Sequence, residues 1–114
     1  RGCCGVQYAV EADGSVYPCD FYVMDEYQIG NFNTDSFDQM DQKRSEIRFI
    51  EQSSQVEKAC RSCHYFLLCR GGCRRNRGNG IQTEPTRNNF CEGYKIFFEK
   101  WYDTLMQLGK LAQR

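Results

Sequence analysis

The chain has 114 residues, of which 40% are hydrophobic, 26% are charged and eight are cysteines. A chain of this length fits one domain with a modest core, so cross-links or bound metal are expected to supplement it. Fifteen basic residues balance fifteen acidic ones, which argues against a nucleic-acid-binding or membrane-surface protein. No signal peptide, membrane-span signal or initiating Met is present, so the sequence is expected to be a fragment of a longer cytoplasmic protein.

The first predicted element is a β-hairpin between residues 6 and 20. Two short runs of β-prone residues flank Asp13 and Gly14, and Asp-Gly between alternating residues is the strongest short-range signal for a hairpin turn. Cys4 and Cys19 lie near the two open ends of this hairpin. The strand pairing therefore brings two distant cysteines close together, as shared metal ligation requires.

Two helices are predicted further along the chain. The first spans about residues 37–50 and follows capping residues at 34–36. The second starts near Cys91, because Asn89 and Glu92 resemble a capping box, and there the helix dipole favours a thiolate. The apolar stripe of this amphipathic helix comprises Tyr94, Phe97, Phe98, Trp101, Leu105, Leu108 and Leu111.

Between Cys60 and Cys91 the chain is rich in Cys, Gly, Arg and Asn, and it has no sustained hydrophobic period. A loop of this length is unusual in a compact domain unless something organises it. The predicted fold class is therefore α+β. We expect one domain over residues 1–114 with a small β-hairpin, irregular cysteine-rich loops, packing helices and a C-terminal amphipathic helix.

The central motif of the sequence is a C-x2-C-x5-C-x3-C array. Such close spacing is typical of metal ligands, because C-x2-C lets two sulfurs converge on one metal centre. The two glycines in the array permit tight turns and close approach of the backbone to a bulky inorganic core. Neighbouring arginines are expected to lower the pKa of the thiols and to neutralise part of an anionic cluster. The cysteines are Cys60, Cys63, Cys69 and Cys73, and the arginines are Arg70, Arg74, Arg75 and Arg77.

Three other interpretations of the cysteines stay open at this point. A disulfide framework suits a small chain with an even number of cysteines, but this inference depends on a secreted context. Structural zinc accounts for the spacing about as well as an iron–sulfur cluster does. Residues 60–64 also match the C-x-x-C-H of c-type haem attachment, but haem would leave most other cysteines unused, so His64 is expected to be a packing residue.

The complete pattern, C-x9-G-x4-C followed by C-x2-C-x5-C-x3-C and a distant Cys, resembles the SPASM domain of radical S-adenosylmethionine enzymes. Within that family, residues 3–23 and 69–77 look most like the anaerobic sulfatase-maturating enzymes. Those enzymes oxidise a Cys or Ser of a sulfatase to formylglycine. The positions that carry the resemblance are Cys4, Gly14, Cys19, Cys60, Cys63, Cys69, Cys73 and Cys91.

The resemblance implies two auxiliary 4Fe-4S clusters with crossed ligation. The first cluster would take Cys4, Cys19 and Cys73, with a fourth ligand that is either an upstream cysteine or Cys3. The second cluster would take Cys60, Cys63, Cys69 and Cys91. Zinc is the expected substitute in an isolated fragment that has lost its clusters.

The resemblance also implies how the longer enzyme works. Asp20, directly after Cys19, is the expected general base that deprotonates the substrate hydroxyl or thiol. A radical domain outside this sequence would hold S-adenosylmethionine and a third 4Fe-4S cluster, and the auxiliary clusters would accept the electron released by the substrate radical. The expected partners are the sulfatase peptide and that radical domain, and the fragment alone is expected to be inactive.

Two alternative functions are compatible with the same residues. A zinc-stabilised interaction module would use the cysteines without any redox role. A radical enzyme that modifies another, ribosomally made peptide would keep both clusters and change only the substrate. The metal content of the protein separates the first alternative from the iron–sulfur interpretation.

Overall fold

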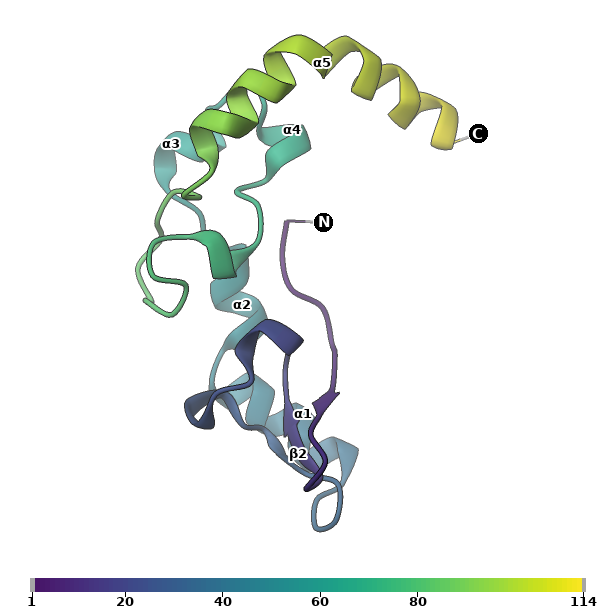
Figure 1. The fold of residues 1–114 in the computed structure, drawn as a ribbon, viewed down its shortest axis with the longest axis vertical. Helices are drawn as coiled ribbons and strands as arrows, with labels where there is room; N and C mark the ends of the chain where they lie inside the picture. Colours follow the sequence, from purple (N-terminus) through teal and green to yellow (C-terminus); the bar gives the residue numbers. More distant parts are fainter. Residues whose placement is uncertain (1, 114) are drawn as a thin grey trace. The chain divides into compact units, whose positions relative to one another are not determined.

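The computed structural model describes residues 2–113, which divide into two compact units. The first unit comprises Cys3–Gln55, and the second comprises residues 56–113 together with Gly2. Helices occur together with a small antiparallel sheet (Figure 1), so the predicted α+β class is confirmed. No helix in residues 2–113 is long and apolar enough to cross a membrane. That the whole chain acts as one domain stays a prediction.

The sheet of the first unit has three antiparallel strands in the order β1, β2, β3, where β1 is Ala9–Val10, β2 is Ser15–Tyr17 and β3 is Gly30–Asn31. The predicted hairpin is confirmed as β1 and β2. Its turn depends on Gly14, which has a φ of +85°, and on Asp13, whose Oδ1 accepts a hydrogen bond from the Ser15 N–H at 2.9 Å. The third strand was not predicted, because two residues are too few to show a β pattern.

The core of the first unit forms where β2 meets the helix that follows the sheet. Its buried members are Val16, Ile29 and Met40, with Tyr8 and Ile47 packed against them. A second, aromatic cluster joins Tyr22 to Phe49, whose ring centroids lie 5.0 Å apart. Each fully buried side chain of this size contributes about 1.5–3 kcal/mol. Two 3₁₀ turns connect β2 to β3, namely η1 (Asp20–Tyr22) and η2 (Asp25–Tyr27).

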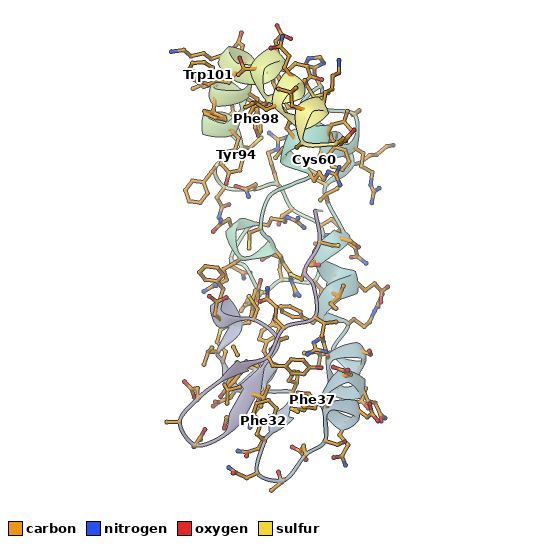
Figure 2. The ribbon with its side chains drawn as sticks, turned by 90° about the vertical axis from the view of Figure 1, so that its right-hand side faces the viewer. Phe32, Phe37, Cys60, Tyr94, Phe98 and Trp101 are labelled. Carbon is orange, nitrogen blue, oxygen red and sulfur yellow. The ribbon has the colours of Figure 1, made fainter. Side chains whose placement is uncertain are left out.

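The helix predicted over residues 37–50 is two helices, α1 (Phe37–Glu46) and α2 (Phe49–Ser54). Its start is confirmed, because Ser36 caps α1 and forms a capping box with Gln39. The continuous helix is wrong, because Arg48 adopts a left-handed conformation with φ of 52°. This turn redirects the chain so that Phe49 reaches the aromatic cluster. At the start of α1, Phe37 lies against Phe32 with ring centroids 5.5 Å apart (Figure 2).

A polar triad joins the segment before β1 to α1. The Tyr8 hydroxyl and the Arg44 guanidinium both donate hydrogen bonds to Oδ1 of Asp41. Arg44 also donates to the backbone carbonyl of Gln7 at 2.8 Å and lies over the Tyr8 ring, 4.6 Å from its centroid. The hydrogen bonds from Tyr8 and Arg44 hold the pKa of Asp41 below its usual range. The triad therefore stabilises the first unit when Asp41 is ionised.

We expect Asp41→Asn to lower the free energy of unfolding at neutral pH. The variant should also lose less stability than the wild type when the pH is lowered. Because the folded pKa of Asp41 is depressed, its contribution is present above the unfolded value of about 3.9 and is lost as pH falls through the folded pKa. Urea unfolding of both proteins between pH 7 and pH 2 measures this. If the free energies of unfolding of the two proteins differ by the same amount at every pH, the charge of Asp41 does not stabilise the fold.

The second unit contains little hydrophobic core. Among its described residues a single hydrophobic side chain, Val56, is buried, whereas Arg74, Arg77 and Asn88 are buried polar residues. Small domains with too little core depend on cross-links or metals for stability. The elements of this unit are α3 (Lys58–Arg61), α4 (Phe66–Cys69), η3 (Arg74–Asn76) and α5 (Cys91–Ala112).

Helix α5 starts at Cys91, as predicted, but the predicted capping box is wrong. Phe90 occupies the cap position without a side-chain bond, and the Asn89 side chain instead donates to the Gly78 carbonyl at 2.8 Å. One side of the apolar stripe packs within the unit, where Phe98 contacts Tyr65 and Tyr94. The other side is exposed and comprises Phe97, Trp101, Leu108 and Leu111 (Figure 2 labels Tyr94, Phe98 and Trp101).

Candidate functional site

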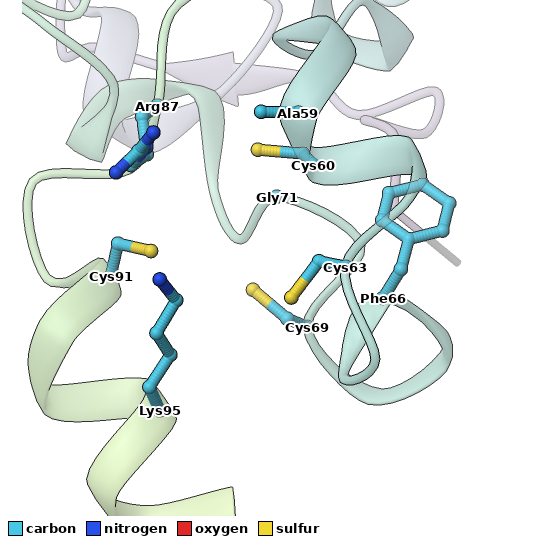
Figure 3. A pocket seen from close by; sticks show the side chains of 9 residues that line it. All are labelled: Ala59, Cys60, Cys63, Phe66, Cys69, Gly71, Arg87, Cys91 and Lys95. Carbon is cyan, nitrogen blue, oxygen red and sulfur yellow. The ribbon is translucent and has the colours of Figure 1, made fainter.

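Four of the eight cysteines line one cavity in the second unit (Figure 3). Cys60 lies in α3, Cys69 is the last residue of α4, and Cys91 is the first residue of α5. Cys63 lies in the connection between α3 and α4. Residues separated by up to 31 positions in the sequence therefore present their thiols to one space.

Consecutive backbone turns place the first three of these thiols. The N–H of Cys63 donates to the carbonyl of Cys60 at 3.1 Å, and the N–H of Cys69 donates to the carbonyl of Tyr65 at 2.9 Å. A further bond joins the Gly72 N–H to the Cys69 carbonyl at 2.8 Å. Each cysteine thus lies at the start or end of a tight turn, and this explains why the spacing C-x2-C-x5-C recurs at metal sites.

The loop between Cys69 and Cys73 is held from inside the unit by Arg77. This buried arginine donates to the carbonyl of Gly71 at 2.9 Å and to that of Gly72 at 2.7 Å. Gly71 has a φ of +83°, and a Cβ there would lie 2.5 Å from a methyl group of Val56. Only glycine fits this position without displacement. The loop is therefore a fixed part of the cavity wall.

Burial is the main influence on the pKa of one cavity thiol, that of Cys60. The pKa of the Cys60 thiol is raised, first by burial and then by the charge of Glu57, whereas Arg87 lowers it. The arginines of the central array were expected to lower thiol pKa values, and for Cys60 this is wrong. The cationic side chains that line the cavity are Arg87 and Lys95, which the sequence analysis did not select. Their signal in the sequence was their spacing of four residues on either side of Cys91.

The other cysteines are distributed over both units. Cys4 and Cys19 are half-buried in the first unit, Cys73 is exposed in the second, and Cys3 is exposed. The pKa of the Cys19 thiol is raised, chiefly by burial and also by the neighbouring charges of Asp20 and Cys4. The N–H of Cys4 donates to Oγ of Ser53 at 2.8 Å. Cys4 and Cys19 are therefore neighbours, as the hairpin prediction requires.

Asp20 is the exposed first residue of η1 and directly follows Cys19. Its Oδ1 accepts a hydrogen bond from the Cys19 thiol, with a distance of 3.3 Å between sulfur and oxygen. A carboxylate that is open to solvent and adjacent to a thiol has room to receive a proton from a bound molecule. His64, by contrast, packs against Tyr102 with ring centroids 4.8 Å apart.

The four-thiol cavity fits a group larger than a single ion. Its volume is about 90 Å³, whereas one water molecule needs roughly 10–15 Å³ by the same measure. Four cysteine thiolates are the standard ligand set of a 4Fe-4S cluster, which they surround rather than approach at one point. In residues 2–113 no three His, Cys, Asp or Glu side chains converge as ligands of one metal ion would, and no disulfide joins the eight cysteines.

Comparison with known proteins connects this site to one family. Residues 3–64 match SPASM, described as an iron–sulfur cluster-binding domain. The chain is 41% identical over 115 residues to a cysteine-type anaerobic sulfatase-maturating enzyme of Clostridium novyi, and the match covers 100% of the chain and 31% of that enzyme. It is 39% identical over 109 residues to the Clostridium perfringens enzyme of the same type, covering 96% of the chain and 30% of the enzyme.

The fold is similar to solved structures of the same group. Native anSMEcpe with bound AdoMet and a peptide superimposes with a TM-score of 0.83 at 38% identity, covering 97% of this chain and 31% of that one. A serine-type sulfatase-maturating enzyme of Bacteroides thetaiotaomicron is 31% identical over 98 residues, which is 84% of the chain and 24% of the enzyme. The chain thus spans less than a third of the length of these relatives.

Proposed function

The chain belongs to the SPASM family of iron–sulfur cluster-binding domains, and on this basis we propose that it is the auxiliary cluster domain of an anaerobic sulfatase-maturating enzyme. The observation that carries the proposal is the cavity lined by four cysteines in a unit with almost no hydrophobic core. A bound cluster supplies the missing stabilisation, because its ligands tie α3, α4 and α5 together. The family and the fold of the unit thus support the same conclusion.

The second cluster would be held by the thiolates that line the cavity. Burial disfavours the thiolate form, as the raised pKa of Cys60 indicates. Bonding to iron would reverse this preference, since metal ligation deprotonates a thiol outright. The Cys60 thiol would therefore release its proton when it binds the cluster. The proposed ligands are Cys60, Cys63, Cys69 and Cys91.

The first cluster is proposed on the resemblance to the family. Its ligands would be Cys4, Cys19 and Cys73, and the fourth would be Cys3 or an upstream cysteine. The proximity of Cys4 to Cys19 in the first unit supports two of these assignments.

Asp20 would act as the general base of the reaction. Its carboxylate adjoins Cys19, a proposed cluster ligand, so a substrate that reaches Asp20 also lies beside the electron acceptor. A proton would then pass to the carboxylate of Asp20, while one electron passes to the cluster. This arrangement suits the two-electron oxidation of a cysteine or serine side chain, because the radical domain would remove a hydrogen atom from the β-carbon and the remaining proton and electron would go to Asp20 and the cluster. Serine would give the aldehyde directly, whereas cysteine would give a thioaldehyde that water converts to the aldehyde with release of hydrogen sulfide.

The longer enzyme would contain a radical domain with S-adenosylmethionine and a third 4Fe-4S cluster, and its substrate would be a sulfatase peptide. The matched relatives are more than three times as long as this chain. The exposed face of α5 defined above is the surface we assign to contact with that domain, because exposed apolar patches on a helix mark interaction surfaces. Sulfatase maturation is accordingly proposed for the whole protein.

Metal analysis tests the proposal. After anaerobic reconstitution we expect about eight irons and eight sulfides per chain if both four-iron clusters form. Cys63→Ala should remove about half of each, because it deletes one ligand of the second cluster. Ser62→Ala is the matched control, since it truncates the neighbouring exposed side chain and should change neither number. One or two zinc ions without sulfide would contradict the proposal and favour the zinc-stabilised module.

A further inference from the structure

Two positively charged side chains line the four-cysteine cavity. In Figure 3 the ammonium of Lys95 points toward the Cys91 thiol, and Arg87 lies on the same side of the cavity as Cys91, across from the other three thiols. Lys95 follows Cys91 by four residues on α5, so both side chains emerge on the same face of the helix. Arg87 reaches the cavity from the loop before α5. The cations therefore approach the site from two separate segments.

Each cation is paired with a carboxylate that does not line the cavity. The Arg87 Nε donates to Oε2 of Glu57 at 3.1 Å, and the Lys95 Nζ lies 3.7 Å from Oε1 of Glu92. Among the described residues that line the cavity, neither Glu57 nor Glu92 is present. The carboxylate of Glu57 nevertheless acts on the Cys60 thiol, whose pKa its charge raises, so Arg87 brings less net positive charge to the cavity than Lys95 does.

These ion pairs contribute little to the stability of the unit. Their side chains are 39–80% exposed, and solvent screens exposed pairs of this kind. A cluster held by four thiolates is anionic, and one-electron reduction adds a further negative charge. Because an electrostatic interaction grows with charge, cations beside the cluster favour its reduced form over its oxidised form.

We propose that Arg87 and Lys95 set the reduction potential of the second cluster by stabilising its reduced form. This inference rests on the proposed function, because it requires the cluster. The step involved is the gain of one electron by the cluster, in which no bond forms or breaks and no proton is transferred. Arg87 and Lys95 are not ligands in this account, and they act only through their charge.

A redox titration of the reconstituted chain tests the inference. Dithionite is the reductant, and electron paramagnetic resonance follows the reduced clusters. The wave that disappears in Cys63→Ala identifies the second cluster, and the remaining wave is an internal control. We expect Lys95→Met to lower the equilibrium constant for reduction of the second cluster about tenfold, which is a fall of about 59 mV for one electron. Glu92→Gln should raise this equilibrium constant, because the substitution removes a negative charge next to Lys95.

Matched variants exclude a merely structural effect. Lys110→Met makes the same charge change on an exposed part of α5 and should leave the potential unchanged. Lys95→Arg keeps the charge and should restore the wild-type potential. Equal potentials in Lys95→Met and Lys110→Met, with iron and sulfide retained in both, would overturn the inference and leave the proposed function intact. Wild-type protein without sulfide would overturn the proposed function itself.

Discussion

Arg77→Met is expected to lower the free energy of unfolding by about 3–6 kcal/mol, since each of two hydrogen bonds from a charged donor contributes about 1.5–3 kcal/mol. The buried guanidinium donates to the carbonyls of Gly71 and Gly72. Without it, both carbonyls lose their charged partner in a unit whose only buried hydrophobic side chain, among the described residues, is Val56. The substitution therefore destabilises the loop that joins two proposed ligands, Cys69 and Cys73.

Urea denaturation of the anaerobic protein, followed by circular dichroism, measures this effect. Arg61→Met is the control, because Arg61 is exposed on α3 and substitutions at such sites usually change stability by less than about 0.5 kcal/mol. The rate at which absorbance near 400 nm is lost gives a second measurement of the same loop. If Arg77→Met and Arg61→Met unfold at the same urea concentration, the Arg77 contacts do not hold the loop.

Asp20→Asn is expected to slow the proposed formylglycine formation, assayed with the longer protein, about 10²–10⁴-fold, which is the usual contribution of a general base. Asparagine has nearly the same shape as aspartate but cannot accept the substrate proton. Conversion of a peptide that contains the target cysteine, followed by mass spectrometry, measures the rate.

Asp25→Asn provides a closely matched control for Asp20. Asp25 is also exposed and is also the first residue of a 3₁₀ turn in the same unit. Iron and sulfide must be measured in both variants, because Asp20 adjoins Cys19 and its replacement must leave the first cluster in place. Equal rates for the two variants with full clusters would refute the role of Asp20 as base.

Local signals in the sequence predicted the elements that local interactions determine. The β1–β2 hairpin was predicted because Asp13 and Gly14 build its turn by themselves. The break between α1 and α2 was not predicted, since Arg48 has no intrinsic preference for a left-handed conformation. That conformation is stabilised by the packing of Phe49 against Tyr22. These two residues lie far apart in the sequence, so no local pattern reveals their contact.

Part of the candidate site could also be predicted from the sequence, namely the cysteines. The spacing of the cysteines predicted a metal centre at Cys60, Cys63, Cys69 and Cys73, whereas the cavity is lined by the first three together with Cys91, the set that the family resemblance implied. That these four thiols bind a cluster stays a prediction. The charged residues were harder to assign. Arg77 was expected to neutralise part of a cluster's charge, yet it is buried and donates hydrogen bonds to glycine carbonyls. Arg87 and Lys95 were missed because their role depends on where α5 begins relative to the loop before it.

The attachment of the glycine loop has a consequence for the lifetime of a bound cluster. Arg77 and Asn88 pair with each other in an isolated β-bridge, and both donate to the carbonyl of Gly71. The loop cannot swing outward unless these contacts break together, so its opening is one cooperative event. If the proposed clusters are bound, this loop would keep Cys69 and Cys73 in place as ligands. Cluster loss would then depend on how often the loop opens locally rather than on the unfolding of the whole chain.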